Sequence, residues 1–414
     1  MSVSVAPTRI RRVEPLAGLA ETRDRRVRRR VALAWGLLVL NALTFYPRTW
    51  SGLPLAIPIP TTVGKLITQG SLPVALLIAL SVNRRIAIRP NVYLCLISLI
   101  GIEAIMTGLQ ADHLGTLYRT FRLIGFIVTL WLLTPWWGRR DLLLVRSHLI
   151  AAGAVLGSVL VGLIVAPSDA LGQGRLAGAL WPSPPTQVAE FAAVTIGLVI
   201  VAWMAGRLRG RIVAWVVPVL TVMLVMTHTR TALLGLVAGV LVAGLSLFLA
   251  RTRVRRMFAV LGVLVSLGAI TVSSAVASWL ARGEGAKGLT TLTGRTTAWS
   301  AVVSLPRDAF QVIFGFGISN ESVNGIPIDS SWLSAYYDLG VFAVVVVATT
   351  LVYLVVSAYF RPSGPQRALG LFLVTYCIIS SFTETGLSGA SIALLELTLG
   401  ASLLVSTGTE AGPL

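Results

Sequence analysis

Residues 231–250 read TALLGLVAGVLVAGLSLFLA, an uninterrupted apolar run without a charged side chain. A helix of about 20 apolar residues spans the hydrocarbon core of a bilayer. Similar runs recur along the chain, for example at residues 257–279. The chain is 55% hydrophobic and only 12% charged, whereas soluble domains carry about 25% charged residues. The runs lack the polar–apolar alternation of strands, so they predict membrane-spanning helices.

The remaining apolar runs predict an all-α polytopic membrane protein of about twelve spans. The expected spans are residues 31–47, 63–82, 91–108, 118–137, 146–166, 187–205, 212–228, 231–250, 257–279, 332–357, 367–383 and 388–406.

These spans predict five parts in the chain. Residues 1–30 form a basic tail, and residues 31–279 hold spans one to nine. A long loop follows at 280–331, then spans ten to twelve at 332–406, and a short tail at 407–414.

Charge predicts the orientation. The formal net charge is +18, and 24 of the 34 basic residues are arginines in the N-terminal tail and in alternate connections between the predicted spans. Cytoplasmic loops carry such an excess, so both termini are expected in the cytoplasm and the long loop outside. Because the arginines lie between apolar runs rather than along one stripe, they do not favour a nucleic-acid partner.

A small set of basic residues falls on the predicted outer side, where topology does not require them. These are Arg48, Lys65, Arg119, Arg122, Arg175, Arg230, Arg282, Lys287, Arg295 and Arg307.

Four of these arginines are candidate anion ligands. Arg122 lies about one turn inside a span, where an arginine either faces a cavity or snorkels to the interface. Arg230 lies in the predicted hairpin at 227–230, as an interfacial anchor or as a ligand for phosphate oxygens. Arg175 lies in a loop rich in glycine and proline. Arg295 precedes a predicted short amphipathic helix at 296–305 that would rest on the membrane.

Asp329 is the acidic residue nearest the entry to the tenth span. It is either the N-cap of that helix or a general base for an incoming hydroxyl. His228 and Glu190 also lie near the predicted outer surface and are accessory candidates, as is Trp332. Cys95 and Cys377 lie in apolar runs, which favours packing roles, and the sequence predicts no metal site.

The order of four segments resembles the O-antigen ligase and O-antigen polymerase superfamily of bacterial envelope glycosyltransferases. The segments are RLAG at 175–178 with its following prolines, TRTAL at 229–233, TGR at 293–295 with GFG at 315–317, and DSSWL at 329–333 with LG at 339–340. The resemblance covers most of the chain and includes the long loop between spans nine and ten.

The resemblance implies a GT-C-like fold in the bacterial inner (plasma) membrane. It further implies an inverting, metal-independent glycosyltransferase without a cofactor. The donor would be an oligosaccharide on polyprenyl diphosphate in the outer leaflet, and the acceptor a glycan or a lipid. Arg122, Arg175, Arg230 and Arg295 would bind the diphosphate, with Asp329 as the base. Ligase members carry histidine at that position, so Asp329 favours a polymerase.

Two other classes remain open. Twelve spans are also typical of transporters and of flippases for lipid-linked glycans, although two equal halves would place the long connection after span six. A scaffold protein would tolerate substitution of all four outer arginines.

Overall fold

The computed structural model describes residues 14–45, 59–110, 114–139, 141–172, 174–248, 252–260, 295–319, 322–323 and 326–405. The N-terminal part consists of α1 (Glu14–Ala42), α3 (Thr61–Val82), α4 (Val92–Gln110), α5 (Leu114–Leu132), η1 (Thr134–Trp136), α6 (Leu143–Val165), α7 (Pro167–Ala170), α8 (Pro185–Met204), α9 (Gly210–Met226) and α10 (Arg230–Phe248). The C-terminal part consists of α14 (Arg295–Ser304), α15 (Ala309–Phe314), the strands β1 (Ser322–Val323) and β2 (Ile326–Pro327), α16 (Ser331–Phe360), α17 (Pro365–Ser380) and α18 (Ile392–Leu404).

Helices occupy most of the described part of the predicted spans; residues 46–47, 249–250, 261–279 and 406 of those spans lie outside the described residues. Six helices (α3, α4, α6, α8, α10 and α16) are long and apolar enough to cross a membrane, and α9 and α18 are apolar but shorter. The chain is therefore an all-helical protein with several candidate membrane spans. The full set of twelve spans and the GT-C-like fold stay predictions.

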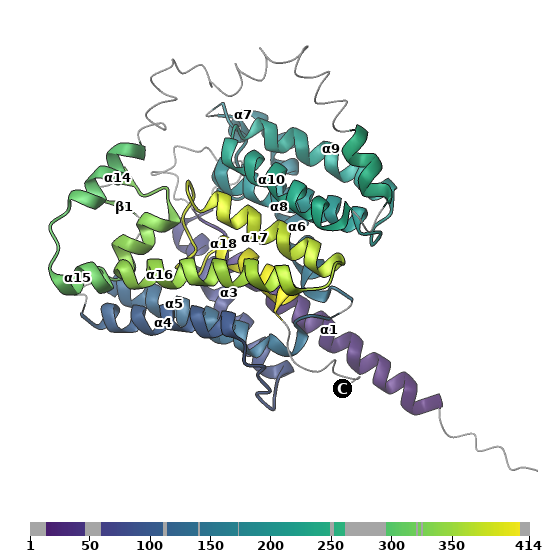
Figure 1. Cartoon of the computed structure of the whole chain (residues 1–414), viewed down its shortest axis with the longest axis horizontal. Coiled ribbons are helices and arrows are strands. Elements are labelled where there is room, and N and C mark those ends of the chain that lie inside the picture. The colour runs from purple at the N-terminus through teal and green to yellow at the C-terminus, as the bar shows by residue number, and fades with distance from the viewer. Residues whose placement is uncertain are drawn as a thin grey trace, which may run out of the picture.

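The helix α1 begins at Glu14, inside the segment expected to be a basic tail. Arginine has a high helix propensity, so the basic segment continues the helix of the first span. Asp24 supports it by pairing with Arg28 one turn later, at 2.6 Å. The N-terminal half of α1 projects from the bundle, on the side away from α14 and α15 (Figure 1).

The bundle core forms around α8, α10, α17 and α18. The helix α10 packs along α17 and α8, and α17 packs along α18. Small residues allow this closeness, because Gly197 and Gly239 both lie directly against the ring of Phe372. Close packing through small residues is typical of helices in a membrane, where apolar contact with lipid competes with apolar contact between helices.

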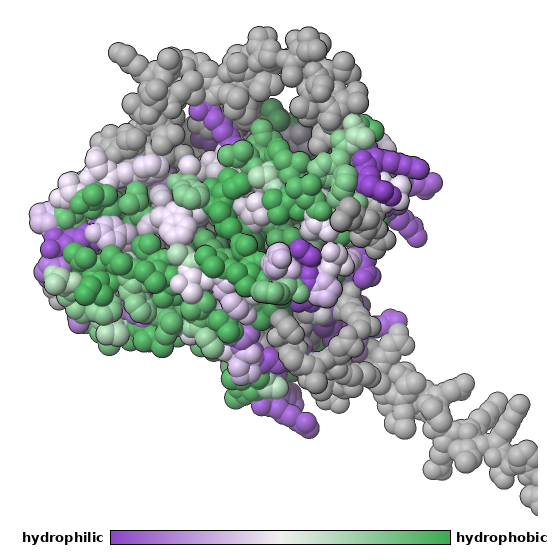
Figure 2. All heavy atoms as spheres, in the orientation of Figure 1, coloured by the Kyte–Doolittle hydropathy of each residue, from purple (hydrophilic) through white to green (hydrophobic). Residues whose placement is uncertain are grey.

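The outer surfaces of the helices expose large apolar side chains. Leu66, Leu109, Ile164 and Trp215 are between 72% and 79% exposed. A broad hydrophobic area covers the face shown in Figure 2, with hydrophilic residues gathered toward its margins. Apolar exposure on this scale is unfavourable in water and favourable in a bilayer, which supports a membrane protein.

Contacts between loops define two ends of the bundle. At one end, Gly138 donates to Ser402 O, and Arg361 donates to Leu404 O. We call this the basic end, because Arg207, Arg361 and Arg367 line a common cavity there. The other end, the Arg230 end, contains the turn at 227–230, the segment 381–391 and the start of α16.

Candidate functional site

The turn between α9 and α10 is held by Arg175. Its Nε donates to Thr227 O at 2.8 Å, and its Nη2 donates to Thr229 Oγ1 at 3.2 Å. The neighbouring Leu176 N donates to Met226 O at 2.9 Å. The loop arginine and the hairpin, separate in sequence, therefore form one structural unit.

Arg230 is the first residue of α10 and belongs to the same unit. Its Nε and Nη2 atoms are buried and make no hydrogen bond with any described residue. A buried guanidinium N–H without an acceptor is costly, and an anionic ligand would remove that cost. The start of a helix adds a favourable dipole for an anion.

The segment after α17 contacts this unit. Thr383 Oγ1 donates to Thr231 Oγ1 at 2.7 Å, so the residue after Arg230 contacts the residue before Glu384. The start of α16 joins from a third direction, because Ser331 Oγ donates to Glu384 O at 2.7 Å. Three chain segments thus meet at the Arg230 end.

Trp332 covers one side of this meeting point. Its Nε1 donates to Ser381 Oγ at 3.0 Å, and its ring lies 6.1 Å from the ring of Phe382. Ser331 N also donates to Ser381 O at 2.9 Å. An aromatic ring held in this way offers an apolar face of the kind against which a sugar or an isoprenoid can pack.

Glu190 and Glu384 form a carboxylate pair at this site. Glu190 lies on α8, and Glu384 lies close enough to interact with it electrostatically. The helix α8 packs against both α10 and α17, which accounts for this approach. The site therefore combines guanidinium groups with carboxyl groups that can accept a proton.

Arg122 lies at the junction of α5 with α1. Its Nη2 donates to Asn41 O at 2.6 Å, and its Nε donates to Asn41 Oδ1 at 3.1 Å. The next residue, Ala42, accepts a hydrogen bond from Gln187 on the first turn of α8, about one turn before Glu190. Arg122 is thus linked to the site through the end of α1.

Asp329 lies just before α16. The N-cap of that helix is Ser330, so the predicted N-cap position of Asp329 is shifted by one residue. Asp329 is two residues from Ser331, which contacts the Glu384 backbone. Asp329 therefore lies near the cluster along the chain.

The long loop contains two helices. The helix α14 begins at Arg295 and matches the expected short helix, while the Arg295 side chain lies outside the described residues. Val302 of α14 is fully buried with Ile328, against Tyr336 and Tyr337 of α16. The loop is thus packed on the start of α16.

Arg307 fixes the connection between α14 and α15. Its guanidinium lies 4.1 Å from the ring centre of Tyr336, and its Nη1 donates to Tyr336 O at 3.0 Å. The backbone of Phe316 and Gly317 then pairs with Tyr337 and Asp338. The described part of the loop supports the first turns of α16, which carry Ser331 and Trp332.

Three of the predicted residues gather in one unit, namely Arg175, His228 and Arg230. Glu190 of α8 interacts electrostatically with Glu384 of the same site, and Trp332 contacts the site through its hydrogen bond to Ser381. Glu384 was missed by the sequence analysis. It follows the eleventh predicted span, on the side predicted to be external, so an acidic residue at a span boundary was the available signal.

No family model matches the chain, and no curated protein matches it. Among the described residues, no three His, Cys, Asp or Glu side chains are grouped as ligands for a metal ion.

Proposed function

We propose that the chain transfers a glycan from a polyprenyl-diphosphate donor at the Arg230 end, as in O-antigen polymerases and ligases. The observation that carries this proposal is the Arg175–Arg230 unit, in which Arg230 keeps two buried donor atoms that have no acceptor among the described residues. A diphosphate supplies several anionic oxygens, and guanidinium is suited to bind them in pairs. The exposed apolar side chains of the helices suit a protein embedded in a bilayer, where a polyprenyl chain resides.

The proposed reaction places a developing negative charge on the diphosphate of the donor, beside the two arginines. The bond between the anomeric carbon and the diphosphate oxygen breaks, and its electron pair moves to the diphosphate. Arg230 and Arg175 stabilise the negative charge that develops there. An acceptor hydroxyl attacks from the opposite face of the sugar, which inverts the anomeric centre, and its proton passes to a carboxylate.

Two carboxylates are candidates for the base. Asp329 occupies the position expected from the resemblance, three residues before Trp332 of α16. Glu384 is the alternative, because its backbone accepts the hydrogen bond of Ser331 and its side chain interacts with Glu190. We propose Asp329 as the base and Glu384 as a residue that positions the acceptor. A polymerase, which repeats the transfer on a growing glycan, is the preferred activity.

The test is a transfer assay with the purified chain in proteoliposomes. The donor is an oligosaccharide linked to polyprenyl diphosphate, and the product is a lengthened glycan. Arg230→Gln is expected to lower the rate about 100-fold, the typical effect of removing one such electrostatic donor. The matched control is Arg85→Gln, because Arg85 is exposed and lies outside the site. Equal rates in the two variants would remove the site from consideration.

A second candidate function is transport. His148 on α6 and Glu396 on α18 are both fully buried, with His148 Nε2 at 3.9 Å from Glu396 Oε1. Glu396 also interacts electrostatically with Glu190. Ionisable side chains inside a helix bundle often serve ion or proton movement in membrane proteins.

If the protein is a transporter, protons should cross the membrane of the proteoliposomes without any glycan transfer. The assay loads proteoliposomes with a pH-sensitive dye and imposes a potential. Transport requires that the flux exceed that of empty vesicles and fall in Glu396→Gln. Glycan transfer with no such flux favours the first function, and a flux without transfer favours the second.

A further inference from the structure

A cavity of about 820 Å³ lies at the basic end. It is bounded by the end of α16, the start of α17, the connection between α8 and α9, and the end of α18. One wall is apolar and contains Tyr353, Val356 and Phe360. Phe360 is 77% exposed, so this wall continues onto the outer apolar surface of the bundle.

The other wall is strongly basic. Arg207, Arg361 and Arg367 line it, and none of the described residues that line the cavity is Asp or Glu. Three positive charges without a carboxylate repel one another, particularly where protein and lipid reduce the dielectric constant. An anion in the cavity would relieve that repulsion.

Hydrogen bonds hold two of these arginines without neutralising them. Arg361 donates to Leu404 O at 2.9 Å and to Gln366 Oε1 at 2.6 Å, and both acceptors are uncharged. Burial lowers the pKa of the Arg361 guanidinium, because removal from water disfavours its charged form. Arg367 donates to Ser363 Oγ at 3.3 Å, while its Nε is buried without a partner among the described residues.

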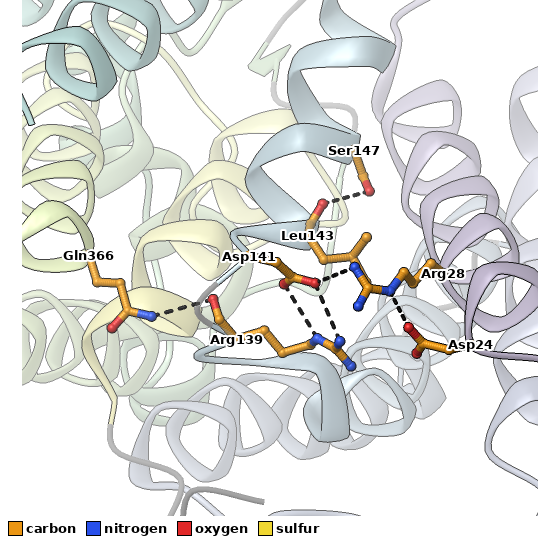
Figure 3. Close-up of polar contacts among 7 residues, drawn as sticks. All are labelled: Asp24, Arg28, Arg139, Asp141, Leu143, Ser147 and Gln366. Atoms are coloured by element: carbon orange, nitrogen blue, oxygen red, sulfur yellow. Dashed lines mark hydrogen bonds and ion pairs between the residues drawn. The ribbon is translucent and has the colours of Figure 1, made fainter. Parts of the chain in front are cut away.

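Asp141 directly precedes Leu142, which lines the cavity, but its carboxylate is engaged elsewhere. Asp141 pairs with Arg28 at 2.8 Å and with Arg139 at 3.3 Å (Figure 3). Gln366 links the two groups, because its Nε2 donates to Gly138 O at 2.9 Å. The charges around Asp141 are thus balanced within the protein, whereas those of the cavity are not.

The start of α17 adds donors. Its N-cap, Gly364, provides no side-chain acceptor, and Pro365 occupies the first helical position. The N–H groups of the first turn therefore point out of the helix start, and both residues line the cavity. The helix dipole adds positive potential there, in the manner of phosphate sites at helix starts.

We propose that this cavity binds the phosphate headgroup of an anionic membrane lipid. The phosphate contacts Arg207, Arg367 and the start of α17, and an acyl chain lies along Tyr353, Val356 and Phe360. Basic cavities between membrane helices commonly bind such headgroups. The site is at the end of the bundle away from Arg230, so it is independent of the proposed glycan transfer.

The test is native mass spectrometry of the purified full chain in detergent. The probes are phosphatidylglycerol, phosphatidylcholine and inorganic phosphate at equal concentration. Wild-type protein is expected to retain phosphatidylglycerol above the other two. Arg207→Gln combined with Arg367→Gln is expected to weaken that binding about tenfold or more, because each arginine near an anionic lipid contributes severalfold. Arg209→Gln, an exposed neighbour outside the cavity, is the control and should bind as wild type.

Two outcomes would overturn the proposal. One is an equal loss of bound lipid in Arg209→Gln and in the double variant, which would mean that general surface charge, rather than the cavity, binds the lipid. The other is retention of inorganic phosphate without lipid, which would mean a site for a free anion. The single variant Arg207→Gln covers the case in which the double variant misfolds. It should fold normally, because the Arg207 side chain is exposed and has no hydrogen bond with any described residue. It should weaken lipid binding severalfold.

Discussion

Gly315 and Gly340 each lie against the backbone that immediately precedes the other, at the contact between α15 and α16. Gly315 has φ 77° and Gly340 has φ 69°, conformations that favour glycine. A Cβ on Gly340 would overlap the backbone of Ile313 and Phe314, and one on Gly315 would overlap that of Asp338 and Leu339. The kink at Gly340 and the close approach of the loop are therefore one feature, which sets the direction of the first turns of α16.

The first prediction concerns this contact. Gly340→Ala should lower the free energy of unfolding by about 1–3 kcal/mol or more, because alanine is strained at this φ and lacks space. Gly153→Ala is the control, since Gly153 lies in α6 with no atom near its Cβ position, and alanine there should be neutral or slightly stabilising. Thermal unfolding in detergent measures both. A Gly340→Ala protein as stable as the control would contradict the contact.

A second prediction concerns Arg307, which joins α14 and α15 to α16. Arg307→Ala removes its stacking on Tyr336 and its hydrogen bond to Tyr336 O. We expect a loss of about 1–2 kcal/mol and faster proteolysis between α14 and α15. Arg307→Lys keeps the charge but not the planar contact, so it should lie between wild type and alanine. Unchanged proteolysis in Arg307→Ala would show that the loop is held by other contacts.

A third prediction separates the two carboxylates. Asp329→Asn should reduce the turnover rate strongly and leave donor affinity nearly unchanged, because a base acts only in the chemical step. Glu384→Gln should raise the KM for the acceptor more than it lowers kcat. Steady-state kinetics with varied donor and acceptor distinguish them. The reverse pattern would make Glu384 the base.

A fourth prediction concerns orientation. Ser363 is exposed at the basic end, and Ser304 is exposed at the end of α14. If the basic end is cytoplasmic, a membrane-impermeant maleimide should label Ser304→Cys in intact cells and label Ser363→Cys only after lysis. The native Cys377 is buried and Cys95 faces the apolar surface, so the parent protein provides the background. Labelling of Ser363→Cys in intact cells would reverse the orientation.

The positions of the helices could be predicted from the sequence, because a long apolar run is itself the signal of a helix buried in lipid or protein. The turn at 227–230 was also predictable, since a short polar break between two such runs permits only a tight connection. The kink at Gly340 was not, because it lies inside an apolar run and depends on the approach of α15.

The site was predictable in part. Arg175 and Arg230 were selected because topology did not require an arginine there, but their connection through Thr227 and Thr229 is a tertiary contact. The partner of Arg122 is Asn41, 81 residues away, which no local pattern indicates. Glu384 belongs to the site through tertiary contacts, because Ser331 of α16 donates to its backbone and the neighbouring Thr383 donates to Thr231 of α10.

The central claim is that the buried donors of Arg230, held in one unit with Arg175, bind the diphosphate of a glycan donor. The most direct measurement is the rate of glycan transfer from a polyprenyl-diphosphate oligosaccharide in proteoliposomes, compared among wild type, Arg230→Gln, Arg175→Gln and Arg85→Gln. We predict that the first two variants lose about 100-fold or more and that Arg85→Gln keeps the wild-type rate. Wild-type transfer by Arg230→Gln, in a protein that folds normally, would contradict the account.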